Sequence, residues 1–372
     1  MNFKILQIGK YSPNIFGGIE TMIETIIDNC PQSVKNTLIC FGNKNKNIYK
    51  KNQRILISKE SFKLFSQPFG IKYLLDIKRE IHNHNIVHLH LPNIFASLIV
   101  LLFKKKNTKI IVHWHSDILG KKILYPLVKV IETKILKISK YIICTSKDYA
   151  FTSKTLIRYT PKIKIIPIGI STKKISFKPK VKNKIHKIIS NNQGKKIILT
   201  TGRLVGYKGF EYLIESFNFL DNKKILIIVG DGPDKSRLLR KSLNFNNIYL
   251  LSNLKKEELE YIYEKADLFC LPSISRAEAF GIVLIEAMKY GLPLITTNVE
   301  GSGMNSINKN NYNGLVVKKE NSKELSRAIN IICNSKRIQK KFSSNSKILF
   351  NKYFTDKIFI KKIVEIYKNA SY

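Results

Sequence analysis

Two carboxylates flank a glycine late in the chain, shortly after the apolar run Leu268–Leu271. Glu278 and Glu286 are separated by seven residues, and Gly281 lies between them. We expect Glu278 in a loop and Glu286 about one turn into a helix that begins near Gly281. The free amides of Phe280 and Gly281 at such a helix start favour anions, phosphate above all. The carboxylates can accept hydrogen bonds from sugar hydroxyls. An ordinary capped helix with two exposed glutamates is the alternative.

A basic, glycine-containing segment follows another apolar run, Lys196–Thr200. It reads Thr-Gly-Arg-Leu-Val-Gly-Tyr-Lys-Gly over residues 201–209. Arg203 offers a two-pronged donor for phosphate and Lys208 a point charge, while the glycines let the backbone approach a ligand closely. The segment therefore predicts an anion site, and a simple basic turn is the alternative.

Gly17 and Gly18 lie between the first apolar run and a helical pattern. Glycines at a helix start suit close approach to a diphosphate. The pattern is not Gly-x-Gly-x-x-Gly, so a nicotinamide site is disfavoured, and a plain turn is the alternative.

Four histidines end two neighbouring apolar runs, in His88-Leu89-His90 and His113-Trp114-His115. We expect His88 and His90 to point to opposite faces of their strand, and His113 and His115 likewise. One histidine of each strand end then faces the ligand, and His88 and His113 are ordinary core histidines. Because no cysteine lies near, we predict no metal site.

Short runs of Ile, Leu and Val alternate with helical patterns along the chain, as in parallel sheets buried on both faces. The βαβ pattern occurs twice, which predicts an α/β chain of two doubly wound, Rossmann-like domains facing across a cleft, with ligands beyond the carboxyl ends of the strands. The expected strands are 4–8, 37–41, 55–57, 86–89, 110–113, 141–145, 163–167, 196–200, 225–229, 248–251, 268–271, 293–296 and 314–317, and expected helices include 211–220, 256–265 and 282–290.

The polar, Lys-rich segment Ser171–Gly194 predicts the domain boundary, because its strand and helix signals are poor. We expect a first, acceptor-binding domain over residues 1–172 and a second, donor-binding domain over residues 173–352. The helical tail at about 353–372 is free to pack back on the first domain.

The net charge is +39, from 65 Lys and Arg against 26 Asp and Glu. Much of this excess follows from a composition dominated by Lys, Asn and Ile, and some from anionic partners. Residues 1–175 hold 30 basic and 9 acidic residues, and the remainder holds 35 and 17. If either half contacts an anionic surface, we expect it to be the first.

Cysteine usage and apolar runs bear on location. Five scattered cysteines without a Cys-x-x-Cys pair indicate a reducing, cytoplasmic compartment. The longest apolar run, Ile94–Phe103, is shorter than the roughly 20 residues of a membrane span, and we expect a buried helix. Residues 121–137 form a basic amphipathic pattern, for which we favour packing in the core. We expect peripheral attachment of the first domain to the cytoplasmic face of the inner membrane.

The segments described above, taken in their order along the chain, resemble the GT-B fold retaining glycosyltransferases of family 4. This family includes phosphatidylinositol mannosyltransferases and O-antigen mannosyl- and rhamnosyltransferases. The similarity runs from Gly17 to about Val317, and 300–306 resembles a loop of O-antigen-type members. The chain departs from the family where Pro167-Ile168-Gly169-Ile170-Ser171 replaces Pro-Asn-Gly-Ile/Val-Asp at the domain junction.

The resemblance implies roles for the matching residues. Arg203 and Lys208 would bind the donor diphosphate, together with the loop of Gly17 and Gly18. Glu286 would hold the ribose hydroxyls. Glu278, beside the amides of Phe280 and Gly281, would contact the transferred sugar, and His115 would lie near its reacting face.

We therefore predict a retaining glycosyltransferase that transfers a hexose-type sugar from a UDP- or GDP-linked donor to a glycan or lipid-linked acceptor in bacterial surface polysaccharide (O-antigen or capsule) synthesis. It would need no cofactor and no metal, because no Asp-x-Asp site is visible. No nucleic-acid motif accompanies the charge. The alternatives are a nucleotide-sugar epimerase of the same fold and, from another class, a basic nucleic-acid-binding protein.

Overall fold

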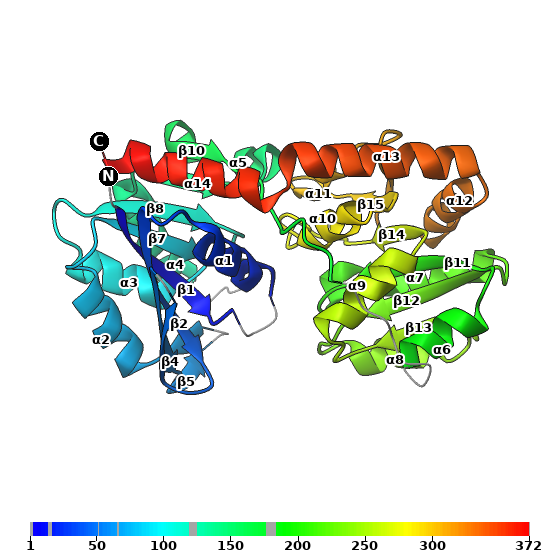
Figure 1. Cartoon of the computed structure of the whole chain (residues 1–372), viewed down its shortest axis with the longest axis horizontal. Helices are drawn as coiled ribbons and strands as arrows, with labels where there is room; N and C mark the ends of the chain where they lie inside the picture. The colour runs from blue at the N-terminus through cyan, green and yellow to red at the C-terminus, as the bar shows by residue number, and fades with distance from the viewer. Residues whose placement is uncertain are drawn as a thin grey trace. The chain divides into compact units, whose positions relative to one another are not determined.

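The computed structural model describes residues 3–13, 17–50, 52–64, 67–118, 125–175 and 184–371. The chain divides into two compact units, each built around its own sheet (Figure 1). Unit 1 comprises Met1–Ser171 together with Thr355–Tyr372, and unit 2 comprises Thr172–Phe354. The first part of the predicted boundary segment, up to Ile175, has no regular secondary structure, and residues 176–183 lie outside the described part.

Unit 1 contains an eight-stranded sheet in the order β10-β9-β8-β7-β1-β2-β4-β3. Its neighbours pair in parallel, except that β3 is antiparallel to β4. The polar strand β3 and a separate hairpin of β5 and β6 were not expected from the sequence. The strands are β1 Phe3–Tyr11, β2 Val34–Gly42, β3 Lys46–Lys50, β4 Gln53–Lys59, β5 Phe62–Leu64, β6 Gln67–Phe69, β7 Ile86–Leu91, β8 Lys109–Trp114, β9 Tyr141–Cys144 and β10 Ile163–Ile165.

Helices cover both faces of this sheet, because its crossovers run in two directions from β1 and parallel crossover connections are as a rule right-handed. Helices α1 (Gly18–Asn29) and α14 (Asp356–Ser371) pack against each other on one face. Helices α2 (Ile71–Glu80), α3 (Ile94–Phe103) and α4 (Tyr125–Ile138) lie side by side on the other. The short helices α5 (Lys147–Thr152) and η1 (Leu156–Lys162) follow β9.

Unit 2 contains a six-stranded parallel sheet in the order β13-β12-β11-β14-β15-β16. The chain reverses direction across the sheet between the neighbours β11 and β14, and ligands of open parallel sheets bind at such a switch point. The strands are β11 Lys196–Thr201, β12 Lys224–Val229, β13 Ile248–Leu251, β14 Leu268–Leu271, β15 Leu294–Asn298 and β16 Gly314–Lys318.

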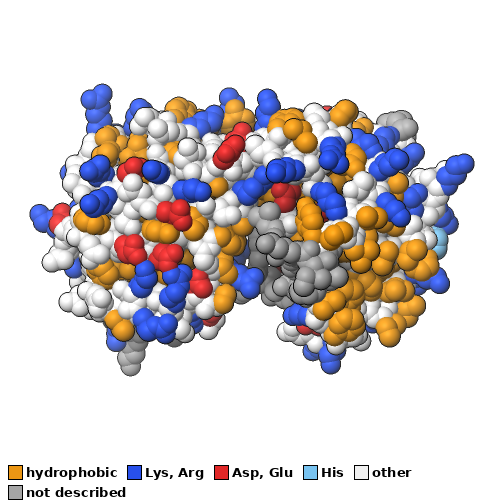
Figure 2. Space-filling view, turned by 180° about the vertical axis from the view of Figure 1, so that it is seen from behind, with side chains coloured by type: hydrophobic (Ala, Val, Ile, Leu, Met, Phe, Trp, Pro, Cys, Tyr) orange, Lys and Arg blue, Asp and Glu red, His pale blue; other side chains and the backbone are white. Residues whose placement is uncertain are grey.

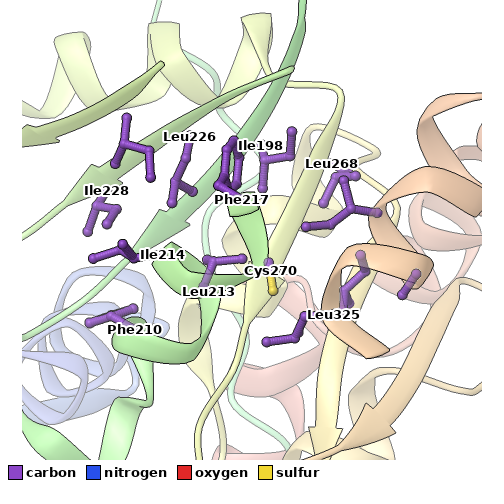
Figure 3. Packing of buried hydrophobic residues seen from close by; sticks show 14 of the residues in the cluster. Ile198, Phe210, Leu213, Ile214, Phe217, Leu226, Ile228, Leu268, Cys270 and Leu325 are labelled. Atoms are coloured by element: carbon purple, nitrogen blue, oxygen red, sulfur yellow. The ribbon is translucent and has the colours of Figure 1, made fainter. Parts of the chain in front are cut away.

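The core of unit 2 joins the sheet to the helices that cover it (Figure 3). Ile198, Leu226 and Leu268 on the strands contact the same cluster as Phe210 on α7 and Leu325 on α12. Removing this surface from water is the main stabilising contribution. The helices are α6 Lys184–Asn191, η2 Gly206–Lys208, α7 Phe210–Ser216, η3 Phe217–Phe219, α8 Lys235–Ser242, α9 Lys256–Lys265, α10 Ile282–Lys289, α11 Met304–Ile307, α12 Ser322–Cys333 and α13 Lys336–Tyr353.

Two sequence expectations need correction. Helix α6 falls inside the boundary segment, where no clear helix signal was visible in the residue pattern. Helix α3 is not wholly buried, because Leu98 and Leu102 are 41% and 67% exposed. Within the described ranges, no helix combines the length and the apolar character that crossing a membrane requires.

Candidate active site

The loops that follow β11 and β14 are hydrogen-bonded to each other. The amide of Ile274 donates to the carbonyl of Tyr207 at 2.8 Å. Gly209 adopts a left-handed conformation with φ of 64°, and a Cβ there would lie 2.2 Å from the carbonyl oxygen of Pro272. Glycine is therefore needed for this close approach, which brings the neighbouring Lys208 to the loop that carries Glu278.

Lys208 and Glu278 form a buried ion pair. The Lys208 Nζ lies 2.5 Å from Glu278 Oε2, and the two residues are 7% and 8% exposed. Ser273 Oγ donates to the same carboxylate oxygen at 3.3 Å. Burial lowers the pKa of Lys208, but the charge of Glu278 and other contacts outweigh burial and hold that pKa above its ordinary value. The site thus holds a permanent ammonium group.

A third loop, after β15, fixes the backbone around Glu278. Ser302 Oγ donates to the Glu278 carbonyl at 2.5 Å, and the Gly303 amide donates to the Ala279 carbonyl at 2.9 Å. A Cβ on Gly303 would lie 2.6 Å from that carbonyl oxygen. The segment 300–306 therefore supports the loop that leads into α10.

Helix α10 begins as the sequence predicts. Gly281 is its N-cap with φ of 87°, a left-handed conformation that favours glycine, and the preceding Phe280 is buried. Phe280 and Gly281 thus stand at the helix N-terminus, close in sequence to Glu278. A helix start of this kind offers amide donors to an anion.

Glu286 lies within α10 and belongs to a separate hydrogen-bonded chain. Tyr263 donates its phenolic proton to Glu286 Oε2 at 2.9 Å and accepts from Thr201 Oγ1 at 2.9 Å. Burial raises the pKa of Glu286, while the bond from Tyr263 lowers it. The ring of Tyr263 stacks on Tyr290 at 5.6 Å between centroids. The arrangement orients a carboxylate beside aromatic surface.

Arg203 occupies the loop after β11 with an exposed side chain. The turn after β12 holds this loop, since the Leu204 amide donates to the Asp231 carbonyl at 2.8 Å. A Cβ on Gly232 would lie 2.4 Å from the Leu204 carbonyl oxygen. The turn Val229–Pro233 therefore supports the loop that carries Arg203, and this structural role is enough to explain its glycines.

The start of α1 in unit 1 holds a carboxylate. Gly17 is the N-cap and Gly18 the first residue of the helix, whereas Phe16 lies outside the described residues. The Glu20 carboxylate folds back so that a Cβ on Gly17 would lie 2.1 Å from Glu20 Oε2. Burial raises the pKa of Glu20, and its own backbone amide and Lys10 lower it. Gly17 thus leaves room for an anionic group at this helix start.

The expectation that the paired histidines point to opposite faces of their strands was wrong. His88 and His90 stack at 4.5 Å between ring centroids, as do His113 and His115. Residues two apart on a strand lie on the same face, because only successive side chains alternate. All four rings therefore form one buried cluster on the sheet face that α14 covers, where Tyr367 contacts His88.

Hydrogen bonds within this cluster limit its use as a metal site. Nitrogen atoms of His88, His90 and His113 lie within 4.8 Å of one another, so their positions could hold an ion. However, His90 Nδ1 lies 3.2 Å from His115 Nε2, and His90 Nε2 lies 3.0 Å from Gln7 Oε1. Both nitrogens of His90 are thus engaged. Coordination by this ring would break one of these bonds.

Burial also controls the charge of the cluster. It lowers the pKa of His88 and of His115 to about 3. It lowers the pKa of His90 and of His113 well below the ordinary value, with further lowering by neighbouring histidines. All four rings are therefore neutral at pH 7.

Comparisons with known proteins agree with this architecture. The family described as "Glycosyltransferase Family 4" matches residues 16–174, and "Glycosyl transferases group 1" matches residues 181–348. The O-antigen chain mannosyltransferase C of Escherichia coli is 25% identical over 370 residues, or 98% of each chain. The chain is a GT-B glycosyltransferase of family 4.

Two further comparisons extend this result. The D-rhamnosyltransferase WbpZ of Pseudomonas aeruginosa is 28% identical to the glycosyltransferase over 256 residues, covering 68% of this chain and 65% of the relative. The solved structure of Anabaena Alr3699/HepE in complex with UDP and glucose superposes with a TM-score of 0.77. It shares 16% identity and covers 98% and 99% of the two chains. The latter likeness supports the fold alone.

Several residues of the glycosyltransferase site were not found from sequence. Ser302 lies within the segment 300–306 and Ser273 shortly before Glu278, but nothing in the sequence distinguished their hydroxyls. Tyr263 is one of 17 tyrosines and lies on a helix remote in sequence from Glu286. The fold, rather than any spacing in the sequence, brings Tyr263 next to Glu286 on α10.

Proposed function

We propose that this glycosyltransferase transfers a hexose-type sugar, with retention, from a UDP- or GDP-linked donor to a glycan or lipid-linked acceptor. The acceptor belongs to bacterial surface polysaccharide synthesis of the O-antigen or capsule type. The observation that carries the proposal is the buried pair of Lys208 and Glu278 at the switch point of the unit 2 sheet. A buried ammonium group next to a helix N-terminus suits a diphosphate.

The donor diphosphate binds to Lys208, Arg203 and the helix start at Phe280 and Gly281. Lys208 and the amides are preorganised by the contacts around Gly209 and Gly303, whereas Arg203 is exposed. As the bond to the sugar breaks, negative charge develops on the leaving nucleoside diphosphate. Donors already aimed at that charge stabilise the transition state without reorganisation.

The two carboxylates take different parts of the donor. Glu286, oriented by Tyr263, accepts hydrogen bonds from the ribose hydroxyls. Glu278 accepts them from the transferred sugar and orients it. Because Glu278 is already engaged by Lys208 and Ser273, we assign it no role as a nucleophile. The family resemblance assigns Gly17 and Gly18 to binding of a diphosphate and His115 to binding of a sugar, and we retain both assignments as part of the proposal.

The names of similar proteins support the substrate class. The two relatives described above are an O-antigen chain mannosyltransferase and a D-rhamnosyltransferase. The HepE structure contains UDP and glucose. Both lines of similarity are consistent with a nucleotide-sugar donor and a polysaccharide acceptor.

We also propose peripheral attachment to an anionic membrane through unit 1. Exposed apolar side chains extend over the adjacent helices α2, α3 and α4, and Figure 2 shows hydrophobic side chains gathered on this face. This outer apolar surface consists of Ile71, Leu75, Leu98, Leu102, Leu127 and Val130. Contiguous exposed apolar surface marks an interaction site.

The charges on these helices suit an anionic leaflet. Their acidic residues, Asp76, Glu80 and Glu132, are all buried. The charged groups that reach solvent on the same helices are basic, among them Lys78, Arg79, Lys134 and Lys137. In helix α4, Ile131, Ile135 and Leu136 pack in the core while Leu127 remains exposed. Residues 121–124 of the amphipathic pattern lie outside the described residues.

A ligand screen followed by a transfer assay tests the enzymatic proposal. Nucleoside diphosphates that bind only the folded protein should raise its Tm in proportion to occupancy. We expect UDP or GDP to raise the Tm more than the other nucleoside diphosphates do. The corresponding nucleotide sugar is then supplied with polysaccharide precursors, and NMR determines the configuration of the new bond. Inversion at the anomeric carbon, or no response to any nucleotide, would contradict the proposal.

A further inference from the structure

A continuous chain of hydrogen bonds runs through the interior of unit 1 from α14 to the end of β8. Gln7 Nε2 donates to the phenolic oxygen of Tyr367 at 2.7 Å and to Asn36 Oδ1 at 3.2 Å. Gln7 Oε1 lies 3.0 Å from His90 Nε2, and His90 Nδ1 lies 3.2 Å from His115 Nε2. The chain links residues from distant parts of the sequence.

The donors and acceptors of this chain determine which ring nitrogens carry protons. Because the amide nitrogen of Gln7 is used by Tyr367 and Asn36, its carbonyl oxygen faces His90 and can only accept. His90 must therefore carry its proton on Nε2, which leaves Nδ1 as an acceptor. The nitrogen of His115 that faces it, Nε2, must then be the donor. This leaves Nδ1 of His115 without a proton.

His115 is the outermost member of the cluster. It is 7% exposed, whereas His88, His90 and His113 are 2% exposed or less. The rings are neutral, because burial lowers the pKa of each. A neutral ring has two tautomers that differ in which nitrogen donates, and an unconstrained ring would present either to a ligand.

We propose that Tyr367, Gln7 and His90 are positioning residues that hold His115 in its Nε2–H tautomer, so that His115 Nδ1 accepts a hydrogen bond from a sugar hydroxyl. This inference rests on the proposed function, because it supplies the ligand class, a polyol. An acceptor at this position selects a hydroxyl group and rejects a group that can only accept. The C-terminal helix α14 acquires a role in the site through Tyr367, whose hydroxyl accepts a hydrogen bond from the Gln7 amide.

The tautomer is measured directly, without reference to activity. Full-length protein labelled with ¹⁵N-histidine is examined at neutral pH by long-range ¹H–¹⁵N correlation, and the His115 signals are assigned by their loss in His115→Gln. The expected spectrum shows His115 protonated on Nε2 and unprotonated on Nδ1. A His115 ring protonated on Nδ1, on both nitrogens, or equally on either, overturns the proposal.

Variants at His90 separate positioning from packing. His90→Leu removes the acceptor and should give His115 mixed tautomers, with kcat lower by about 10- to 100-fold, the range found for partners that orient metal-bound histidines. His90→Asn retains an acceptor oxygen near the position of Nδ1 and should restore most of kcat and the Nε2–H signals. His82→Ala, at an exposed position of the same unit, is the control.

The outcomes distinguish this proposal from the proposed function. If His90→Leu leaves the His115 signals unchanged, the chain of hydrogen bonds does not set the tautomer of His115. If His90→Leu does not fold, Tyr367→Phe, which deletes one oxygen atom, is expected to broaden or shift the same signals, and an unchanged spectrum is again contrary. Absence of sugar transfer by the wild-type protein would contradict the proposed function, while the wild-type spectrum still decides the tautomer.

Discussion

The ammonium group of Lys208 lies 2.5 Å from the carboxylate of Glu278, and both are buried in the switch-point loops of unit 2. Each group neutralises the other in surroundings where a lone charge is costly. A donor diphosphate that approaches Lys208 must share it with Glu278. The pair therefore couples the stability of this site to the binding of its ligand.

Lys208→Ala should weaken both donor use and stability. Each charge-assisted hydrogen bond lost to phosphate should cost about 1.5–3 kcal/mol in kcat/KM. The free energy of unfolding should fall by about 3–5 kcal/mol, because Glu278 is left buried without its partner. Steady-state kinetics with the donor and denaturant unfolding measure the two effects.

The double variant Lys208→Ala/Glu278→Gln is the matched control for this prediction. It removes both charges and should recover much of the lost stability while activity stays low. Unchanged kcat/KM in the single variant would exclude Lys208 from donor binding.

Tyr263→Phe should make donor binding more sensitive to acid. Tyr263 stabilises the ionised form of Glu286, so its removal should raise the pKa of that carboxyl further above its ordinary value. As the pH falls, the variant should lose its carboxylate acceptor for the ribose at a higher pH than the wild type. The measurement is donor KM from pH 8 to pH 5. Parallel pH profiles would count against the role of Glu286.

Turnover should survive chelation, because the proposed charge stabilisation comes from Lys208, Arg203 and backbone amides. Activity is measured after dialysis against EDTA and again after adding Mg²⁺ or Mn²⁺. Equal rates are expected. Loss of activity in EDTA and its recovery with either ion would refute this account of the diphosphate site.

The sequence predicted the buried strands well because continuous Ile, Leu and Val runs have few other uses in a soluble α/β chain. It also indicated Glu278, Gly281 and Lys208, because each lies shortly after the end of a predicted strand, where ligands of open parallel sheets bind. It did not indicate β3, which is polar and lies at a sheet edge. Tyr263 and Gln7 were missed, since their partners are set by sheet order rather than by sequence spacing.

The histidine cluster shows a second kind of limit. His88 and His90 lie on one face because strand side chains repeat every two residues, so correct use of the spacing would have paired them. No spacing could have shown that His90 meets His115 from the next strand, or that Tyr367 reaches Gln7 from α14. These contacts depend on strand register and on the return of the C-terminal helix.

His113→Leu should protect unit 1 against mild acid. Neither ring nitrogen of His113 has a hydrogen-bond partner among the described residues, and burial holds its pKa well below the ordinary value. Between that value and about 6.5 the unfolded chain binds more protons, so stability falls as the pH falls below about 6.5. At pH 5 this cost is about 2 kcal/mol per histidine.

Fluorescence of Trp114, the single tryptophan and buried in β8, reports unfolding of unit 1. His113→Leu should raise the free energy of unfolding relative to the wild type, and this increase should be about 2 kcal/mol larger at pH 5 than at pH 7.5. His82→Leu, at an exposed position, is the control for loss of a histidine. The same gain at both pH values would show that His113 does not contribute to acid sensitivity.

Leu98→Gln/Leu102→Gln should weaken membrane attachment without affecting the sugar-transfer site. These leucines lie at the centre of the outer apolar surface, on a helix flanked by Lys105 and Lys106. Near an anionic leaflet each lysine contributes about 1 kcal/mol, and burial of leucine in the interface adds to this. The wild type should therefore co-sediment with vesicles increasingly as their anionic lipid content rises, and less at high salt. The double variant should partition at least about tenfold more weakly, which corresponds to a loss of about 1.4 kcal/mol. Leu243→Gln alters a leucine of unit 2 that is 78% exposed and should behave like the wild type. If the wild type stays in the supernatant at every lipid composition, the membrane proposal fails, whereas the glycosyltransferase assignment does not depend on it.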